Sequence, residues 1–226
     1  SLQCLVRAGQ ELRERLSTDH WGLMRNALDT ARSVHASAGT LQAVVSREAV
    51  LAGIERLTLL MSAMTGAQSD RMTRDHGWRL LTLGRLIERL ATTGWRLQTF
   101  LDSRALASEE GLDSLLELSD SIITFRARHQ RHTDLLALAD VLVLDDTNPR
   151  SLAGVLRRLR TEIGKLPGDA TALAALAAQL PPVGAGLRAA DLASRDEAGD
   201  RLAEQRLAEP VAERYFTPAH ALEVRL

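Results

Sequence analysis

Apolar residues recur at intervals of three or four through almost the whole chain, which is the spacing of one face of an α-helix. The pattern is present from the start, where Leu2, Leu5, Leu12 and Leu16 fall on or near one side. Residues 141–144, VLVL, have strand character, but no convincing sheet is indicated anywhere. The sequence therefore predicts an all-α fold, a multi-helix bundle.

Helix starts are marked by residues whose side chains can accept a hydrogen bond from the first turn. Ser17 is predicted to begin one helix, and Ser108 another that continues through residues 112–125. Asn148 is predicted to be an N-cap, with Pro149 at the first helical position, where its missing N–H costs nothing.

A long central helix is predicted from a cap at Ser69, after a stop at Gly66, to about Leu101. It contains residues 74–97, RDHGWRLLTLGRLIERLATTGWRL, which place charged side chains inside an otherwise apolar helix. Residues 134–145 are apolar on most sides and predict a central buried helix, with Thr133 as its cap. The central helix is our candidate for the active or partner-facing element.

The whole chain is expected to form a single helical domain, residues 1–226. Within it we expect a main bundle at 1–166 and shorter C-terminal helices at 167–226 that pack on it. Residues 151–166 align without gaps on residues 1–16, sharing the Ser-Leu start, one arginine and the final leucine, which indicates a possible internal duplication. On that interpretation the chain begins inside a duplicated unit.

On the central helix, Glu88 stands apart from the leucine stripe that docks the helix. At about 100° per residue, it lies in line with Leu81 and Trp95, within a second and largely apolar row. Arg85 and Arg89 lie beside it on the same helix. One interpretation is a structural ion pair in a dry core. The other is a site in which Arg85 or Arg89 binds a carboxylate or phosphate while Glu88 orients it or acts as a base.

Composition and charge exclude several classes of partner and site. The formal net charge is −1, aromatic residues make up 3%, and no stacking platform accompanies the basic run at 126–132, so nucleic acid is not expected as a partner. His129 and His132 are three residues apart, but the neighbouring arginines would repel a cation, and no metal is expected. Cys4 is the only cysteine, no leader pattern is present and no apolar run approaches the length needed to cross a bilayer, so a cytoplasmic protein without a membrane role is expected.

Several motifs together resemble those of the bacterial alpha-E domain family, a helical domain with a Glu-Arg signature. Residues 74–93 resemble its second Glu-Arg motif; RERLSTDHW, LADVLVLDDTNPRSL and ERYFTP resemble other segments of it. The positions that fall on the Glu-Arg pattern are Arg74, Asp75, Gly77, Trp78, Gly84, Arg85, Glu88 and Arg89. The family's first Glu-Arg helix is absent, which agrees with the abrupt start, and VRAGQ at residues 6–10 stands where the family usually has an Arg-Glu-Asn-x-x-Arg run.

The resemblance implies an accessory domain of an ATP-grasp amide-bond-forming system that forms or modifies peptides. Its expected partners are a circularly permuted ATP-grasp protein and a transglutaminase-like protein. ATP and Mg are expected on the ATP-grasp partner, because no Gly-rich phosphate loop precedes a lysine here. The alternative is an independent enzyme with a Glu/Arg site. The candidate catalytic residues are Glu88, Arg85 and Arg89, and the candidate substrate- or partner-binding residues are Arg74, Asp75, Trp78, Asp145, Asn148 and Arg150.

Overall fold

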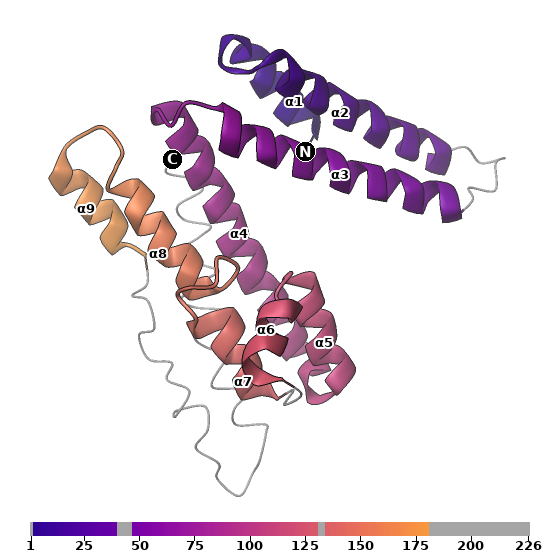
Figure 1. Cartoon of the computed structure of the whole chain (residues 1–226), viewed down its shortest axis with the longest axis vertical. Coiled ribbons are helices and arrows are strands. Elements are labelled where there is room, and N and C mark those ends of the chain that lie inside the picture. The colour runs from indigo at the N-terminus through magenta and orange to yellow at the C-terminus, as the bar shows by residue number, and fades with distance from the viewer. Residues whose placement is uncertain (1, 40–46, 131–133, 181–226) are drawn as a thin grey trace, which may run out of the picture. The chain divides into compact units, whose positions relative to one another are not determined.

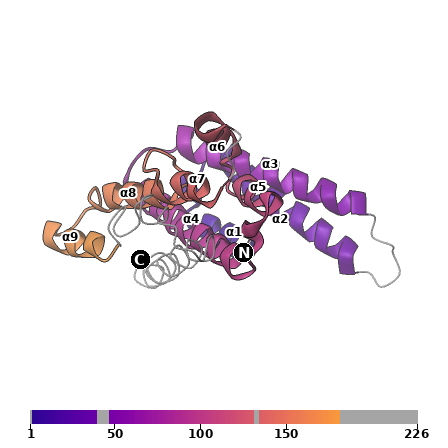
Figure 2. The same ribbon diagram turned by 90° about the horizontal axis from the view of Figure 1, so that it is seen from below.

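A computed structural model describes residues 2–39, 47–130 and 134–180. Within these ranges the chain contains helices and turns and no strand, which confirms the all-α prediction (Figures 1 and 2). The elements in chain order are α1 (Leu2–Glu11), η1 (Arg13–Arg15), α2 (Thr18–Gly39), α3 (Arg47–Arg71), α4 (His76–Asp102), η2 (Ala105–Ala107), α5 (Glu109–Leu118), α6 (Ile122–His129), α7 (Leu135–Ala139), η3 (Asp140–Leu144), α8 (Leu152–Ile163) and α9 (Ala170–Ala178).

The chain divides into two compact units, Ser1–Trp78 and Arg79–Leu226. In the first unit α2 packs along α3, and α1 packs against α2 (Figure 1). The buried residues that hold these helices together are Met24, Ala27, Leu60 and Met64. Ser17 caps α2 as predicted, since its Oγ accepts a hydrogen bond from the His20 N–H at 3.1 Å.

The predicted boundary between α3 and the central helix was wrong. α3 continues through Gly66 and Ser69 to Arg71, and the central helix α4 begins at His76. Asp75 supplies the cap, because its Oδ1 accepts the Trp78 N–H at 3.0 Å. A carboxylate at this position satisfies an orphan donor of the first turn and also suits the positive end of the helix dipole.

α3 leaves an apolar side in solvent. Leu51, Ile54 and Leu59 are all about half exposed or more, at 48%, 50% and 69%. By length and composition α3 could cross a membrane, a test that a core helix of a soluble protein also passes. No run long enough to cross a bilayer was expected from the sequence, because Glu55 and Arg56 interrupt the apolar residues of this helix.

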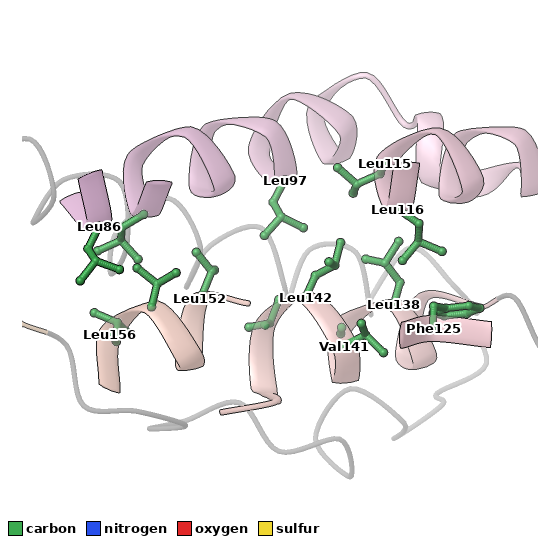
Figure 3. Close-up of a cluster of buried hydrophobic side chains, with 14 of the residues drawn as sticks. Leu86, Leu97, Leu115, Leu116, Phe125, Leu138, Val141, Leu142, Leu152 and Leu156 are labelled. Carbon is green, nitrogen blue, oxygen red and sulfur yellow. The ribbon is translucent and has the colours of Figure 1, made fainter. Parts of the chain in front are cut away.

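The second unit is built on the apolar side of α4. Leu86 and Leu97 of α4 face the buried residues of the elements from α5 to α8, among them Leu142 and Leu152 (Figure 3). Leu90 and Leu97 have no exposed surface. Burial of each leucine side chain stabilises the fold by roughly 1.5–3 kcal/mol. The shared core therefore determines which side of α4 faces away from it.

The helix that starts at Ser108 is shorter than predicted. Ser108 caps α5 through the Gly111 N–H, at 3.1 Å, but α5 ends at Leu118 and a separate α6 starts at Ile122. Between them Asp120 has a φ of 50°, the left-handed region, which a continuous helix cannot contain. The break brings Ser119 to the side of α4.

Residues 134–145 are helical and largely buried, as predicted, but they do not form one regular α-helix. α7 is followed by a π-helical turn, η3, in which Val141, Leu142 and Val143 are almost fully buried. Asp134 is the cap, since its Oδ1 accepts the Ala137 N–H at 2.7 Å. The predicted cap Thr133 lies outside the described residues.

The region before α8 also differs from the prediction. α8 begins at Leu152 with Ser151 as its N-cap, through the Gly154 N–H at 2.8 Å, whereas Asn148 and Pro149 lie in the preceding turn. α9 follows with Asp169 as its cap and packs beside α8. Most of the predicted C-terminal segment 167–226 lies outside the described residues, so the single-domain organisation and the internal duplication stay predictions.

Candidate functional site

A groove of about 610 Å³ runs along the outer side of α4. Its walls come from α4, from the end of α5 and from the turn before α8. The lining residues are Leu80, Leu81, Gly84, Arg85, Glu88, Arg89, Thr92, Thr93, Arg96, Ser119 and Arg150. We call this the Glu88 groove. It brings together four of the predicted site residues, Glu88, Arg85, Arg89 and Arg150.

Glu88 is exposed in this groove rather than buried in a core. Its Oε1 accepts a hydrogen bond from the Thr92 hydroxyl at 3.2 Å, one helical turn along α4. Among the described residues no cation lies within 4.0 Å of its carboxylate. Trp95, in the same predicted row, is 56% exposed. A dry structural ion pair on Glu88 is therefore not what the described chain contains.

The arginines of the groove are held close enough to affect one another. Burial lowers the pKa of Arg85 below its usual range, and the charge of Arg158 on α8 lowers it further. Burial also lowers the pKa of Arg89, to which Arg150, Arg85 and Arg158 add their repulsion. Asp120 acts in the opposite direction. These residues remain cationic at neutral pH, so the pKa shifts report a concentration of positive charge.

Three contacts hold arginine side chains of the groove, two to backbone carbonyls and one to a carboxylate. Arg89 Nη1 donates to the Pro149 carbonyl at 3.4 Å, at the limit of a hydrogen bond. Arg96 Nη1 donates to the Leu118 carbonyl, the last of α5, at 2.7 Å. Arg150 Nη2 lies 2.6 Å from Asp120 Oδ2, an exposed ion pair of the kind that contributes at most about 1 kcal/mol.

The predicted residues Arg74, Asp75 and Trp78 form a separate cluster in the first unit. Asp75 caps α4 and forms an ion pair with Arg15, while the Arg74 guanidinium lies over the Trp78 ring at 5.6 Å. The pKa of the Asp75 carboxyl is lowered, first by its hydrogen bond from the Trp78 N–H and also by Arg15. The Trp78 Nε1–H donates to the Gln68 carbonyl at 3.1 Å. This last bond joins the end of α3 to the start of α4, whereas Arg15 joins η1 to the cap of α4.

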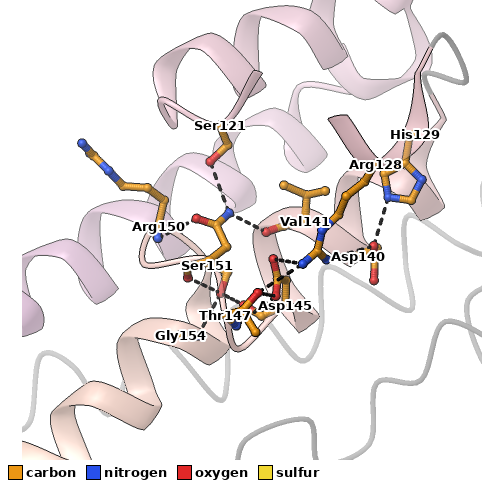
Figure 4. Close-up of polar contacts among 11 residues, drawn as sticks. Ser121, Arg128, His129, Asp140, Val141, Asp145, Thr147, Arg150, Ser151 and Gly154 are labelled. Atoms are coloured by element: carbon orange, nitrogen blue, oxygen red, sulfur yellow. Dashed lines mark hydrogen bonds and ion pairs between the residues drawn. The ribbon is translucent and has the colours of Figure 1, made fainter. Parts of the chain in front are cut away.

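Asn148, a candidate binding residue, is buried and connects three segments of the chain. Its Nδ2 donates to the Val141 carbonyl at 2.9 Å and lies 3.4 Å from Ser121 Oγ, and its Oδ1 accepts the Arg150 N–H at 2.9 Å (Figure 4). The amide therefore joins η3, the start of α6 and the turn before α8. Through its last bond it also positions Arg150 of the Glu88 groove.

Asp145 lies in the same network and is also buried. Its Oδ1 accepts hydrogen bonds from the N–H and the hydroxyl of Thr147, at 2.9 and 2.6 Å. Its Oδ2 lies 3.0 Å from Arg128 Nη2, an ion pair that lacks hydrogen-bond alignment (Figure 4). Burial raises the pKa of Asp145, but the Thr147 hydrogen bonds, Arg128 and the Asn148 N–H outweigh it, and the pKa lies below its ordinary value. The Asp145 carboxylate stabilises the turn that contains Thr147.

The model of one protein family matches residues 1–216, and its description is a predicted alpha-helical domain with a conserved ER motif. The chain belongs to the Alpha-E family. The Glu88-Arg89 dipeptide of this Alpha-E chain lies in the groove.

Curated relatives agree over most of the chain. Uncharacterized protein Rv2567 of Mycobacterium tuberculosis is 31% identical over 172 residues, which are 75% of this chain and 19% of the relative. Uncharacterized protein Mb2597 of Mycobacterium bovis is 30% identical over the same shares. The matched part of this Alpha-E chain thus spans about a fifth of the length of these relatives. No solved structure matches it significantly.

Three residues were missed in the sequence: Arg96 and Ser119, which line the Alpha-E groove, and Arg158, whose charge acts on Arg85 and Arg89. Arg96 had a usable signal, because it lies seven residues after Arg89 and so on the same helical face. Ser119 lies at the end of α5 and Arg158 lies on α8, so no spacing along α4 predicts them. Among the described residues no group of three His, Cys, Asp or Glu side chains could hold a metal ion, and His129 instead lies 3.0 Å from Asp140.

Proposed function

We propose that this Alpha-E chain is the accessory helical domain of a cytoplasmic ATP-grasp amide-bond-forming system, in which it docks the ligase or presents substrate. The observation that carries the proposal is the placement of Glu88 and its arginines in an open groove. Charged groups that served only to hold the bundle together would be satisfied by one another in the interior. Here they face outward, where a second molecule can reach them.

Apolar surface beside the groove supports the same proposal. Leu80, which lines the groove, is 52% exposed, and Trp95 on the same helix is 56% exposed. Tryptophan is among the residues that contribute most to protein interfaces when a partner covers them. We assign ATP and Mg²⁺ to the ligase, a circularly permuted ATP-grasp protein, because no glycine-rich phosphate loop precedes the single lysine, Lys165.

The test is a pull-down of the cognate ATP-grasp protein with the 226-residue chain, followed by an assay of amide formation with and without it. We expect co-purification, and a reduced yield of complex for Trp95→Ala. Ile123→Ala is the matched control, since Ile123 is 81% exposed on α6 and does not line the groove. No association, together with normal ligase activity in the absence of the chain, would refute the proposal. A transglutaminase-like protein enters the same assay as a second proposed partner.

A second candidate function is an independent enzyme that uses Glu88 as base and Arg85 and Arg89 to hold an anionic substrate. The specific observation in its favour is the Glu88 carboxylate, which has no cation within 4.0 Å among the described residues and is open to the groove. This candidate requires turnover by the purified chain without ligase. It also requires that Glu88→Gln abolish turnover while the melting temperature stays unchanged.

A further inference from the structure

Positive charge is concentrated around the Glu88 groove beyond what the described carboxylates balance. Arginines at positions 85, 89, 96, 150 and 158 line it or act on it electrostatically, against Glu88 and Asp120. Arg85 and Arg89 are four residues apart, a spacing at which like charges destabilise a helix.

The two carboxylates leave most of that charge in place. Asp120 is already engaged with Arg150, at 2.6 Å. Glu88 is bonded to Thr92 and lies more than 4.0 Å from the cations of the described chain. The guanidinium of Arg89 is held by one long bond to a carbonyl, at 3.4 Å, which leaves further N–H donors of its fork unused in that contact.

Neutral donors lie among these arginines. The hydroxyls of Thr93 and Ser119 line the same groove, and each can donate a hydrogen bond. Gly84 contributes no side chain, and nothing lies within 4 Å of the place where a Cβ would stand. The groove is therefore open beside Arg85 and Arg89, with N–H and O–H donors on its walls.

We propose that the Glu88 groove binds an oxyanion, the carboxylate or phosphate group of a small molecule or peptide, through Arg89 and Arg150. Guanidinium groups bind both kinds of oxyanion through paired N–H donors. The inference rests on the proposed function for the role of the groove in presenting substrate. It adds the chemical class of the ligand. It is tested without the ligase.

The experiment is a titration of the 15N-labelled 226-residue protein, followed by NMR. Sodium phosphate and sodium succinate are the two probes, and sodium chloride at matched ionic strength is the reference. We expect saturable shifts of the amide signals of residues 84–93 and 149–151 with at least one probe and not with chloride. Saturation by phosphate alone assigns the ligand a phosphate group, and saturation by succinate a carboxylate.

Variants then locate the site. Arg89→Gln is expected to weaken binding of the effective probe by about fivefold, the size of effect that an exposed charge pair provides. Arg126→Gln is the control, because Arg126 is an exposed arginine of α6 outside the groove. Glu88→Gln should strengthen binding by about twofold, since it removes a negative charge from the groove. Arg89→Lys, checked by circular dichroism, replaces Arg89→Gln if that variant fails to fold.

Shifts that follow chloride as well as the two probes would overturn the inference. Equal weakening by Arg89→Gln and Arg126→Gln would overturn it too, since it would show general screening instead of a site. Loss of oxyanion binding with an intact pull-down of the ligase contradicts this inference alone. Oxyanion binding without any ligase association contradicts the docking proposal alone.

Discussion

The Thr92 hydroxyl donates a hydrogen bond to Glu88 Oε1 across one turn of α4, at 3.2 Å. Glu88 is thus bonded to a neutral neighbour on its own helix and to no cation of the described chain within 4.0 Å. An exposed contact of this kind adds little to the stability of the fold.

Glu88→Gln is accordingly expected to change the free energy of unfolding by less than about 0.5 kcal/mol, because surface substitutions away from caps and cores have effects of that size. Urea unfolding followed by circular dichroism measures it. A loss of about 2 kcal/mol or more would show that Glu88 is structural and would remove it from the candidate site.

Asn148→Ala is expected to destabilise the fold by about 3 kcal/mol, since it leaves the buried Val141 carbonyl without its partner and removes the bond that holds the Arg150 N–H. The same urea experiment measures the loss. Asp146→Ala is the control two residues away, because Asp146 is exposed. Similar behaviour of the two variants would mean that the Asn148 network contributes nothing specific.

Two glycines should respond to alanine in opposite directions. A Cβ on Gly154 would collide with the backbone carbonyl of Asn148. Overpacking substitutions lower the free energy of unfolding by about 1–3 kcal/mol, and Gly154→Ala is expected to lower it by about 2 kcal/mol or more. A Cβ on Gly84 would meet nothing within 4 Å, so Gly84→Ala should stabilise α4 by about 0.5–1 kcal/mol. Thermal unfolding of both variants checks the signs. A Gly154→Ala protein as stable as the parent would contradict the close approach of α8 to this turn.

His20 makes the first unit sensitive to mild acid. It is almost fully buried, at 2% exposure, and burial lowers its pKa below the ordinary 6.5. The unfolded chain therefore takes up the proton first, so stability is complete above about pH 6.5 and decreases as the pH falls below it. His20→Gln should lose this dependence between pH 7.5 and 5.5 in urea unfolding, whereas His76→Gln, at an exposed position, should keep it. A parent protein equally stable at both pH values would refute the prediction.

Much of the helical architecture could be predicted because its signals are local. Ser17 and Ser108 cap their helices as predicted, since a short side chain before an apolar repeat acts within one turn. The prediction of Ser69 as the cap of the central helix was wrong, because a serine can also lie inside a helix. Asp75 caps α4 instead. The break at Asp120 leaves the apolar periodicity intact, and its one local signal is the run Ser119-Asp120-Ser121, since Ser and Asp favour caps and turns.

The site was predictable only as far as it lies on one helix. Glu88, Arg85 and Arg89 share a face of α4 by spacing alone, and the structure keeps them together. Their environment was not predictable, since Trp95 suggested an apolar row and is in fact exposed. The role of Asn148 depends on Val141 and Ser121, which only the packing of η3 and α6 brings near.

The π-helical turn at Asp140–Leu144 constrains how this protein can change in length. A π-turn accommodates one residue more than an α-turn, and such bulges are rare in helices. Deleting a single residue there would allow a regular α-helix, but it would change which residues the turn places against the core and against Asn148. Insertions and deletions among Alpha-E sequences are therefore expected before Asp134 or after Ile163, and not between them. An alignment of many members would reveal this as a block of constant length.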